Sequence, residues 1–201
     1  MAAGGIVLCG GQSSRMGTSK ALLPFGPETM LQRVVRLLRS VVNPVVIVAA
    51  PEQALPELPD TVVVARDERS GRGPLEGLRA GWRAMPDPVE IAYVTSCDVP
   101  LIEPAFVTRM LENLSNCEIA AVQAERFLQP LAAAYRRSTL PVIEQMLAND
   151  DLRVTSLLER VPTRRVRPEE VTDIDPKLWS LWNLNTPDDY EQALLAYHEG
   201  R

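Results

Sequence analysis

The sequence predicts an α/β protein with a doubly wound, mostly parallel sheet flanked by helices. Short β-branched and aliphatic runs, such as residues 45–50, are bounded by proline, as expected of strands buried on both faces. Between such runs lie longer segments with apolar residues at helical spacing, such as residues 30–42. Strands that alternate with helices favour a sheet whose ligands bind at the carboxyl ends of the strands.

The alternation is clear in the first half and less regular in the second. We expect strands over residues 5–8, 45–50, 61–65, 91–96, 119–122, 131–135 and 163–166. We expect helices over residues 30–42, 75–85, 104–114, 140–147, 153–160 and 187–199. The last helix begins at Thr186 and Pro187, with two acidic residues in its first turn. No repeat or linker interrupts the 201 residues, so we expect one domain over 1–201.

Composition excludes several classes of protein. A formal net charge of −5 argues against a nucleic-acid surface and suits a small anionic ligand in a local basic pocket. The odd count of three cysteines, without C-x-x-C spacing, indicates neither a disulfide framework nor a zinc site. No apolar run is long enough to span a bilayer, and no secretory signal begins the chain. We therefore expect a cytoplasmic protein with no membrane association.

The glycine-rich segment 8–20 follows the first predicted strand and has the features of a phosphate-binding loop. Gly10 and Gly11 allow a ligand to approach the backbone, so that amide N–H groups can contact anionic oxygens. Arg15 and Lys20 add positive charge, and Lys20 is one of only two lysines in the chain. Neither the P-loop spacing nor the dinucleotide fingerprint is present. An ordinary strand-to-helix turn with solvated cations is the alternative.

Asp98 directly follows the predicted strand 91–96, and Pro100 turns the chain away from the sheet. Its carboxylate should therefore project into the cleft that faces the glycine-rich loop. A hard oxygen ligand at this place suits Mg²⁺ that bridges nucleotide phosphates. The alternative is that Asp98 forms an Asx turn before the proline.

Asp67 follows another predicted strand and should lie on the same edge. Its carboxylate could accept hydrogen bonds from the N1–H and amino group of guanine. Pairing with Arg66, Arg69 or Arg72 is the competing interpretation. The loop that follows, through Gly73, Pro74 and Leu75, could close over a base or could be a structural turn.

Near the end of the chain, residues 182–187 alternate apolar and amide side chains. Asn183 and Asn185 therefore fall on the same side of an extended segment, where they could contact a polar ligand. Asn185 could instead cap the helix that starts at Pro187. The single histidine, His198, lies three residues from the end, so no histidine-based catalytic triad is expected.

Taken together, these segments resemble the molybdenum cofactor guanylyltransferases, a branch of the Mg²⁺-dependent nucleotidyltransferases, from end to end. The resemblance is carried by residues 8–11, 15–17, 20–24, 73–77, 97–101 and 183–188. It implies a Rossmann-like nucleotidyltransferase fold, with residues 1–98 on the nucleotide side and 99–201 on the acceptor side. Three departures stand out: Ala50 replaces a frequent asparagine, and Cys9 and Glu76 replace alanines.

The resemblance also implies the reaction and the roles of individual residues. GMP would pass from GTP to the terminal phosphate of molybdopterin cofactor, with release of pyrophosphate and no covalent enzyme intermediate. Asp98 would bind Mg²⁺, and Asn183 and Asn185 would lie towards the acceptor. Arg15 and Lys20 would neutralise the phosphates. GTP would be held by Leu8, Cys9, Gly10, Gly11, Lys20, Asp67, Gly73, Pro74 and Leu75.

Two alternatives stay open at this point. The first is a cytidylyltransferase, or a sugar-phosphate or alcohol-phosphate nucleotidyltransferase, of the same fold. The second is a non-catalytic nucleotide-binding protein that serves as an adaptor for a molybdoenzyme assembly partner. Molybdoenzyme assembly proteins are also the partners that we expect for the enzyme.

Overall fold

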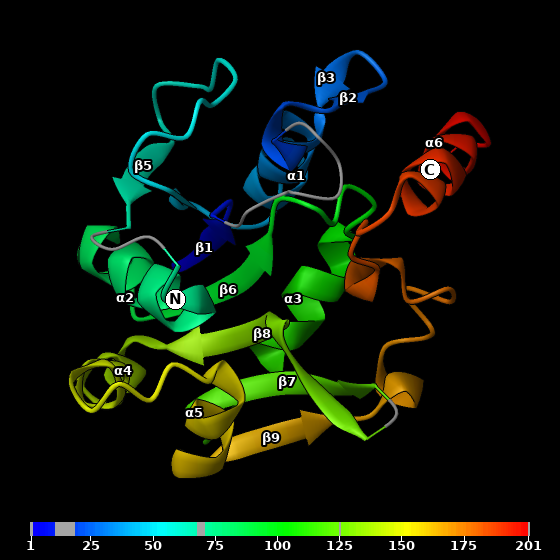
Figure 1. The fold of residues 1–201 in the computed structure, drawn as a ribbon. Helices are drawn as coiled ribbons and strands as arrows, with labels where there is room; N and C mark the ends of the chain where they lie inside the picture. The colour runs from blue at the N-terminus through cyan, green and yellow to red at the C-terminus, as the bar shows by residue number, and fades with distance from the viewer. Residues whose placement is uncertain (1, 11–18, 68–70, 125, 201) are drawn as a thin grey trace.

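The computed structural model describes residues 2–10, 19–67, 71–124 and 126–200. These residues form a seven-stranded sheet in the order β5-β4-β1-β6-β8-β7-β9 (Figure 1). The strands are β1 (Ala3–Leu8), β4 (Val45–Ala49), β5 (Val63–Arg66), β6 (Ile91–Ser96), β7 (Ile119–Ala124), β8 (Phe127–Arg136) and β9 (Thr163–Val166). β8 runs antiparallel to β6 and β7, whereas the other pairings are parallel. The predicted doubly wound, mostly parallel sheet is confirmed.

Helices cover both faces of this sheet, which is why the central strands β1 and β4 are apolar throughout. In β1, Val7 faces α1 (Met30–Arg39) and α3 (Pro104–Glu112), whereas Ile6 and Leu8 face α2 (Gly73–Ala84). The helices α4 (Leu140–Ala148) and α5 (Val154–Arg160) extend the second layer (Figure 1). Alternate residues of a strand point to opposite faces, so a strand that is covered on both faces favours apolar residues at successive positions.

A smaller apolar cluster lies beside the main sheet. It joins the short strands β2 (Pro24–Phe25) and β3 (Glu28–Thr29) to the terminal helix α6 (Pro187–His198). Short 3₁₀ segments complete the described elements: η1 (Lys20–Leu22), η2 (Arg137–Thr139), η3 (Pro168–Glu170) and η4 (Trp179–Leu181). Within the described parts of the chain, every helix is too short or too polar to cross a membrane.

Element boundaries differ from the sequence prediction where tertiary contacts decide them. α1 ends at Arg39 rather than at residue 42, yet Val42 still packs into the core from the following turn. β8 begins four residues before the predicted start, at Phe127, because it pairs with β7 in a long antiparallel hairpin. The β2–β3 pair was not predicted, since two-residue strands leave no periodic pattern.

Arg33 is a buried charged residue that ties α1 to two other parts of the fold. Its Nε donates to the carbonyl oxygen of Pro100 at 2.7 Å, and its guanidinium lies 4.5 Å from the ring centroid of Tyr197 in α6. The side chain also lies 5.4 Å from the ring centroid of Phe25. The loop after Asp98 is thereby fixed to α1 and α6.

Replacing Arg33 with alanine is expected to lower the free energy of unfolding by about 2–4 kcal/mol, from the loss of a charged hydrogen bond and cation–π contacts. Urea denaturation followed by circular dichroism measures this. Arg36→Ala is the matched control, because Arg36 is 56% exposed and pairs with Glu28 at the surface. Its loss should cost less than about 1 kcal/mol. Equal destabilisation by both changes would contradict this role of Arg33.

Candidate active site

A pocket of about 640 Å³ opens at the carboxyl ends of the central parallel strands. Parallel strands that leave the sheet at one edge bring residues that are distant in sequence into the same crevice. The pocket is lined by Leu8, Cys9 and Gly10 after β1, Val48 and Ala50 at β4, Asp67 after β5, and Ser96, Cys97 and Asp98 after β6. The remaining lining residues are Lys20, Gly71, Gly73, Pro74, Gly77, Leu131 and Asn183.

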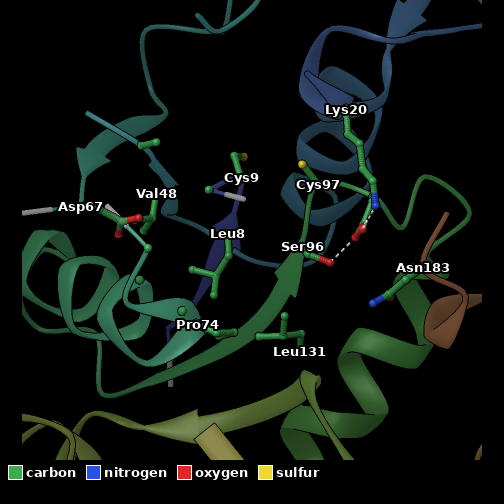
Figure 2. Close-up of a pocket in the computed structure, with 16 residues that line it drawn as sticks. Leu8, Cys9, Lys20, Val48, Asp67, Pro74, Ser96, Cys97, Leu131 and Asn183 are labelled. Atoms are coloured by element: carbon green, nitrogen blue, oxygen red, sulfur yellow. Dashed lines mark hydrogen bonds and ion pairs between the residues drawn. The ribbon is translucent and has the colours of Figure 1, made fainter. Parts of the chain in front are cut away.

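One end of the pocket holds a lysine and an aspartate in direct contact. Lys20 Nζ lies 2.7 Å from Asp98 Oδ2, and both side chains are largely buried. The same ammonium donates to Asn185 Oδ1 at 2.9 Å. Ser96 Oγ donates to the other oxygen of Asp98 (Figure 2). Lys20 therefore joins the segment after the glycine-rich loop to the end of β6 and to the segment before α6.

The Asp98 carboxylate is chemically suited to a hard divalent cation. It lines the pocket, and its two oxygens contact the Lys20 ammonium and the Ser96 hydroxyl. The described residues contain no cluster of three or more histidine, cysteine or acidic side chains arranged to hold a metal. Mg²⁺ is commonly held by one or two carboxylates together with substrate phosphates and water. The residues at this end thus fit a cation that arrives with a nucleotide.

The other end of the pocket presents the carboxylate of Asp67. Its Oδ1 is buried and has no hydrogen-bond partner among the described residues. Its Oδ2 would lie 3.0 Å from a Cβ atom built on Gly10, so the carboxylate closely approaches the backbone of the first loop. Burial, with a smaller contribution from the charge of Glu76, raises the pKa of Asp67 to about 6. Figure 2 shows Asp67 and Lys20 on opposite sides of the pocket, with Leu8 and Cys9 between them.

The structure describes two of the three arginines that were expected to compete for Asp67, and both have other partners. Arg66 donates to the carbonyl oxygens of Ala50 and Gln53 at 2.8 and 2.7 Å. Arg72 pairs with Asp150 at 3.1 Å. The third predicted competitor, Arg69, lies outside the described residues. Among the described residues, neither of the other two arginines pairs with Asp67.

The glycine-rich turn before α2 forms one wall. Gly71 and Gly73 adopt positive φ angles of 82° and 74°, which favour glycine. Pro74 lines the pocket at the start of α2 (Figure 2). Leu75, in contrast, is fully buried between α2 and the sheet, so its side chain belongs to the core rather than to the pocket. Sequence spacing alone did not show that Pro74 lines the pocket whereas the side chain of Leu75 does not.

Asn183 and Asn185 have separate places beside the pocket. Asn183 lines it directly, and Asn185 contacts Lys20. The alternative that Asn185 caps α6 is wrong, because Thr186 is the cap: its Oγ1 accepts from the Asp189 N–H at 3.1 Å. The segment is fixed beside Asp98 by the Leu184 N–H, which donates to the Asp98 carbonyl at 2.9 Å.

Two of the predicted site residues, Gly11 and Arg15, lie outside the described residues. The structure adds two others that sequence reasoning missed. Ser96 contacts Asp98, and a Ser-x-Asp pattern at a strand end was the available signal. Gln53 Nε2 donates to the Cys9 carbonyl at 3.0 Å and to Ser19 Oγ at 3.2 Å, which braces both ends of the glycine-rich segment. No local pattern indicated Gln53, because its partners lie far away in sequence.

Cys9 and Cys97 lie next to each other in the pocket floor. Both are buried, and their strands are in register at Leu8 and Ser96. A hydrogen bond with Cys97 and burial raise the pKa of the Cys9 thiol well above its ordinary value. A thiol held in its neutral form is a poor nucleophile, so packing is the better interpretation of Cys9.

Solved structures share this fold over nearly the whole chain. The protein is similar to molybdopterin-guanine dinucleotide biosynthesis protein A from Archaeoglobus fulgidus, with a TM-score of 0.81 and 20% identity over 98% of this chain and 99% of that one. It is also similar to a nucleotidyl transferase from Methanothermobacter thermautotroptrophicus, with a TM-score of 0.76 and 18% identity over 100% and 99% of the two chains. The fold is that of the nucleotidyltransferases.

The sequence comparisons narrow the class to one family. The family model for the MobA-like NTP transferase domain matches residues 5–166. A probable molybdenum cofactor guanylyltransferase from Carboxydothermus hydrogenoformans is 34% identical over 95% of this chain and 94% of its own length. A molybdenum cofactor guanylyltransferase from Desulfosudis oleivorans is 31% identical, over 98% and 96% respectively. The chain belongs to the molybdenum cofactor guanylyltransferase family, and the resemblance predicted from its motifs is confirmed.

Proposed function

We propose that this protein transfers GMP from GTP to the terminal phosphate of molybdopterin cofactor in the presence of Mg²⁺. The products are molybdopterin guanine dinucleotide and pyrophosphate. The observation that carries the proposal is a single pocket with two chemically different ends. One end offers Asp67, whose Oδ1 has no hydrogen-bond partner among the described residues, and the other offers Lys20 and Asp98. Such a pocket suits a ligand with hydrogen-bond donors at one end and phosphates at the other.

At the first end, Asp67 is proposed to bind the guanine base. N1–H and the 2-amino group of guanine are adjacent donors, and a carboxylate supplies two acceptors. Adenine offers an acceptor at N1, so the same carboxylate would repel it. Leu8, Pro74 and the backbone of Gly10 and Gly73 would enclose the base and ribose, because they line the same pocket and Gly10 lies beside Asp67.

At the second end, Lys20 is proposed to bind the phosphates, together with Arg15 and the backbone of Gly11. Asp98 would hold Mg²⁺, which supplies charge neutralisation on the phosphate oxygens when it is bound. Lys20 would exchange its contact with Asp98 for the phosphates, whose charge is greater. Asn183 and Asn185 would position the acceptor beside the α-phosphate, since they border this end of the pocket.

The reaction requires positioning and charge rather than a covalent enzyme intermediate. An oxygen of the acceptor phosphate forms a bond to the α-phosphorus of GTP, the bond from that phosphorus to the bridging oxygen breaks, and pyrophosphate leaves. A phosphate oxygen is already ionised at neutral pH, so we assign no general base. The chain would act as a single domain in the cytoplasm, which its three free cysteines suit. Molybdoenzyme assembly proteins are proposed partners.

A panel of GTP, CTP, ATP and UTP, each with and without Mg²⁺, tests the nucleotide assignment. Calorimetric binding and thermal stability should both respond to GTP most strongly, because a ligand that binds only the native state stabilises it. When the protein is then incubated with GTP and molybdopterin cofactor, pyrophosphate should be released. Preference for CTP would favour a cytidylyltransferase instead. Nucleotide binding that does not depend on Mg²⁺ and leads to no turnover would favour a nucleotide-binding adaptor.

A further inference from the structure

The side chain of Gln53 lies where the backbone hydrogen bonds between β1 and β4 stop. The two strands are parallel, with Leu8 opposite Val48, and the Cys9 N–H donates to the Val48 carbonyl at 2.8 Å. Because the bonds of a parallel pair follow one another at even spacing, the next would run from the Ala50 N–H to the Cys9 carbonyl. The Ala50 N–H donates instead to Gln53 Oε1 at 3.1 Å.

The same amide group also binds the acceptor of that missing hydrogen bond. Gln53 Nε2 donates to the Cys9 carbonyl at 3.0 Å. Since a backbone N–H only donates and a carbonyl only accepts, these two partners determine the orientation of the amide. The Gln53 amide is thus inserted between β1 and β4 in place of their next hydrogen bond. Cys9 and Ala50, the residues that it separates, both line the pocket.

The backbone of Gln53 is itself fixed to the sheet. Its N–H donates to the Ala50 carbonyl at 3.1 Å, which closes a tight turn after β4. Arg66, the last residue of β5, donates to the carbonyl oxygens of both Ala50 and Gln53. The amide therefore extends from a turn that is held by two strands, so the sheet determines where it lies.

A second hydrogen bond from Gln53 Nε2 reaches the residue before Lys20. Its acceptor is Ser19 Oγ, at 3.2 Å. Ser19 is the N-cap residue of η1, but its side chain makes no capping hydrogen bond, so its hydroxyl joins η1 to the sheet instead. Lys20 follows directly and contacts Asp98 at 2.7 Å and Asn185 at 2.9 Å. Gln53 thus fixes the start of the segment that carries the Lys20 ammonium.

We propose that Gln53 is a positioning residue for phosphate binding: its amide separates β1 from β4 at the pocket and, through Ser19, sets where Lys20 meets the phosphates of GTP. This inference rests on the proposed role of Lys20. One amide nitrogen binds both the Cys9 carbonyl and the Ser19 hydroxyl. The separation of the strands and the position of Lys20 therefore depend on the same side chain.

A double-mutant cycle with Lys20 tests the inference. Calorimetry in the presence of Mg²⁺ measures the GTP dissociation constants of the wild type, Gln53→Met, Lys20→Ala and the double variant. Methionine is similar in length to glutamine and uncharged, but it cannot donate to Cys9 or Ser19. Gln53→Met is expected to weaken GTP binding about 10-fold, and less than about twofold when Lys20 is already alanine. A purely structural role of Gln53 would change GTP binding equally, or not at all, in both backgrounds.

The outcomes separate this inference from the proposed function. If Lys20→Ala binds GTP as tightly as the wild type, the proposed role of Lys20 fails and this inference fails with it. If Lys20→Ala weakens binding, but Gln53→Met does not or does so equally in both backgrounds, the inference alone is overturned. Gln145→Met is the matched control, because Gln145 is an exposed residue of α4; GTP binding should not change.

Circular dichroism checks that each variant is folded. Should Gln53→Met fail to fold, Ser19→Ala replaces it in the cycle, because this change removes only the hydroxyl that joins η1 to Gln53. Ser19→Ala is expected to give a smaller loss of GTP affinity, which again disappears when Lys20 is alanine. Unchanged GTP affinity in a folded Ser19→Ala protein, or an equal loss in both backgrounds, would overturn the inference.

Discussion

Replacing Lys20 with alanine is expected to lower kcat by about 100-fold or more, because it removes a full positive charge from the proposed phosphate-binding end of the pocket. Lys20 is the ammonium in direct contact with Asp98, and it also holds Asn185. Its loss therefore affects both the phosphates and the proposed acceptor side. Steady-state release of pyrophosphate from GTP and molybdopterin cofactor measures the effect, with circular dichroism as the check on folding.

Lys177→Ala is the matched control for this change. Lys177 is the other lysine of the chain, is exposed, and lies 4.9 Å from the ring centroid of Trp179. The same substitution there should leave kcat within about twofold of the wild type, because a surface cation contributes little. A Lys20→Ala protein that is folded and retains more than a tenth of the wild-type kcat would contradict the proposed role of Lys20.

Asp67→Asn is expected to weaken GTP binding by about 100-fold, because two hydrogen bonds to a charged acceptor are replaced by one neutral bond and a donor that faces a donor. The preference for GTP over ITP should fall in parallel. Asp87→Asn is the matched control, since Asp87 is 88% exposed at the surface and pairs with Arg137. Unchanged GTP affinity in Asp67→Asn would show that another group recognises the base.

The pKa of Asp67 gives this prediction a pH dependence. Because that pKa is raised to about 6, the carboxylate is protonated below this pH and loses acceptor capacity. GTP affinity should therefore decline as the pH falls through about 6, and Asp67→Asn should remove this part of the pH profile. A flat profile for the wild type would contradict the assignment.

The raised pKa of Asp67 also predicts how the free energy of unfolding depends on pH. Its contribution to stability falls as the pH rises, whereas GTP affinity is expected to increase. The folded protein holds the Asp67 proton more tightly than the unfolded chain, whose aspartate has the ordinary pKa of 3.8. The contribution of Asp67 to stability therefore falls as the pH rises between about 4 and 6, and ionised Asp67 is unfavourable at pH 7. Asp67→Asn should thus be at least as stable as the wild type at pH 7, so a loss of GTP binding cannot be attributed to unfolding.

The fold class and the edge of the sheet that carries the site can be predicted from the amino-acid sequence alone. Apolar runs and helical periodicity depend on residues only a few positions apart, so they can be recognised in the sequence without a structure. The glycine-rich segment before Lys20 and the aspartates after two strands are also local patterns. Topology then requires them to meet, because parallel strands share one carboxyl edge.

Which side chains contact one another at this edge depends on how distant parts of the chain pack together. Lys20 bonds to Asp98 and to Asn185, residues 78 and 165 positions away, so no window of sequence contains these contacts. Leu75 and Pro74 are neighbours in sequence, yet helix rotation directs Leu75 into the core and leaves Pro74 at the pocket. Packing between distant segments sets the charge environment of the site, and local propensity carries no information about it.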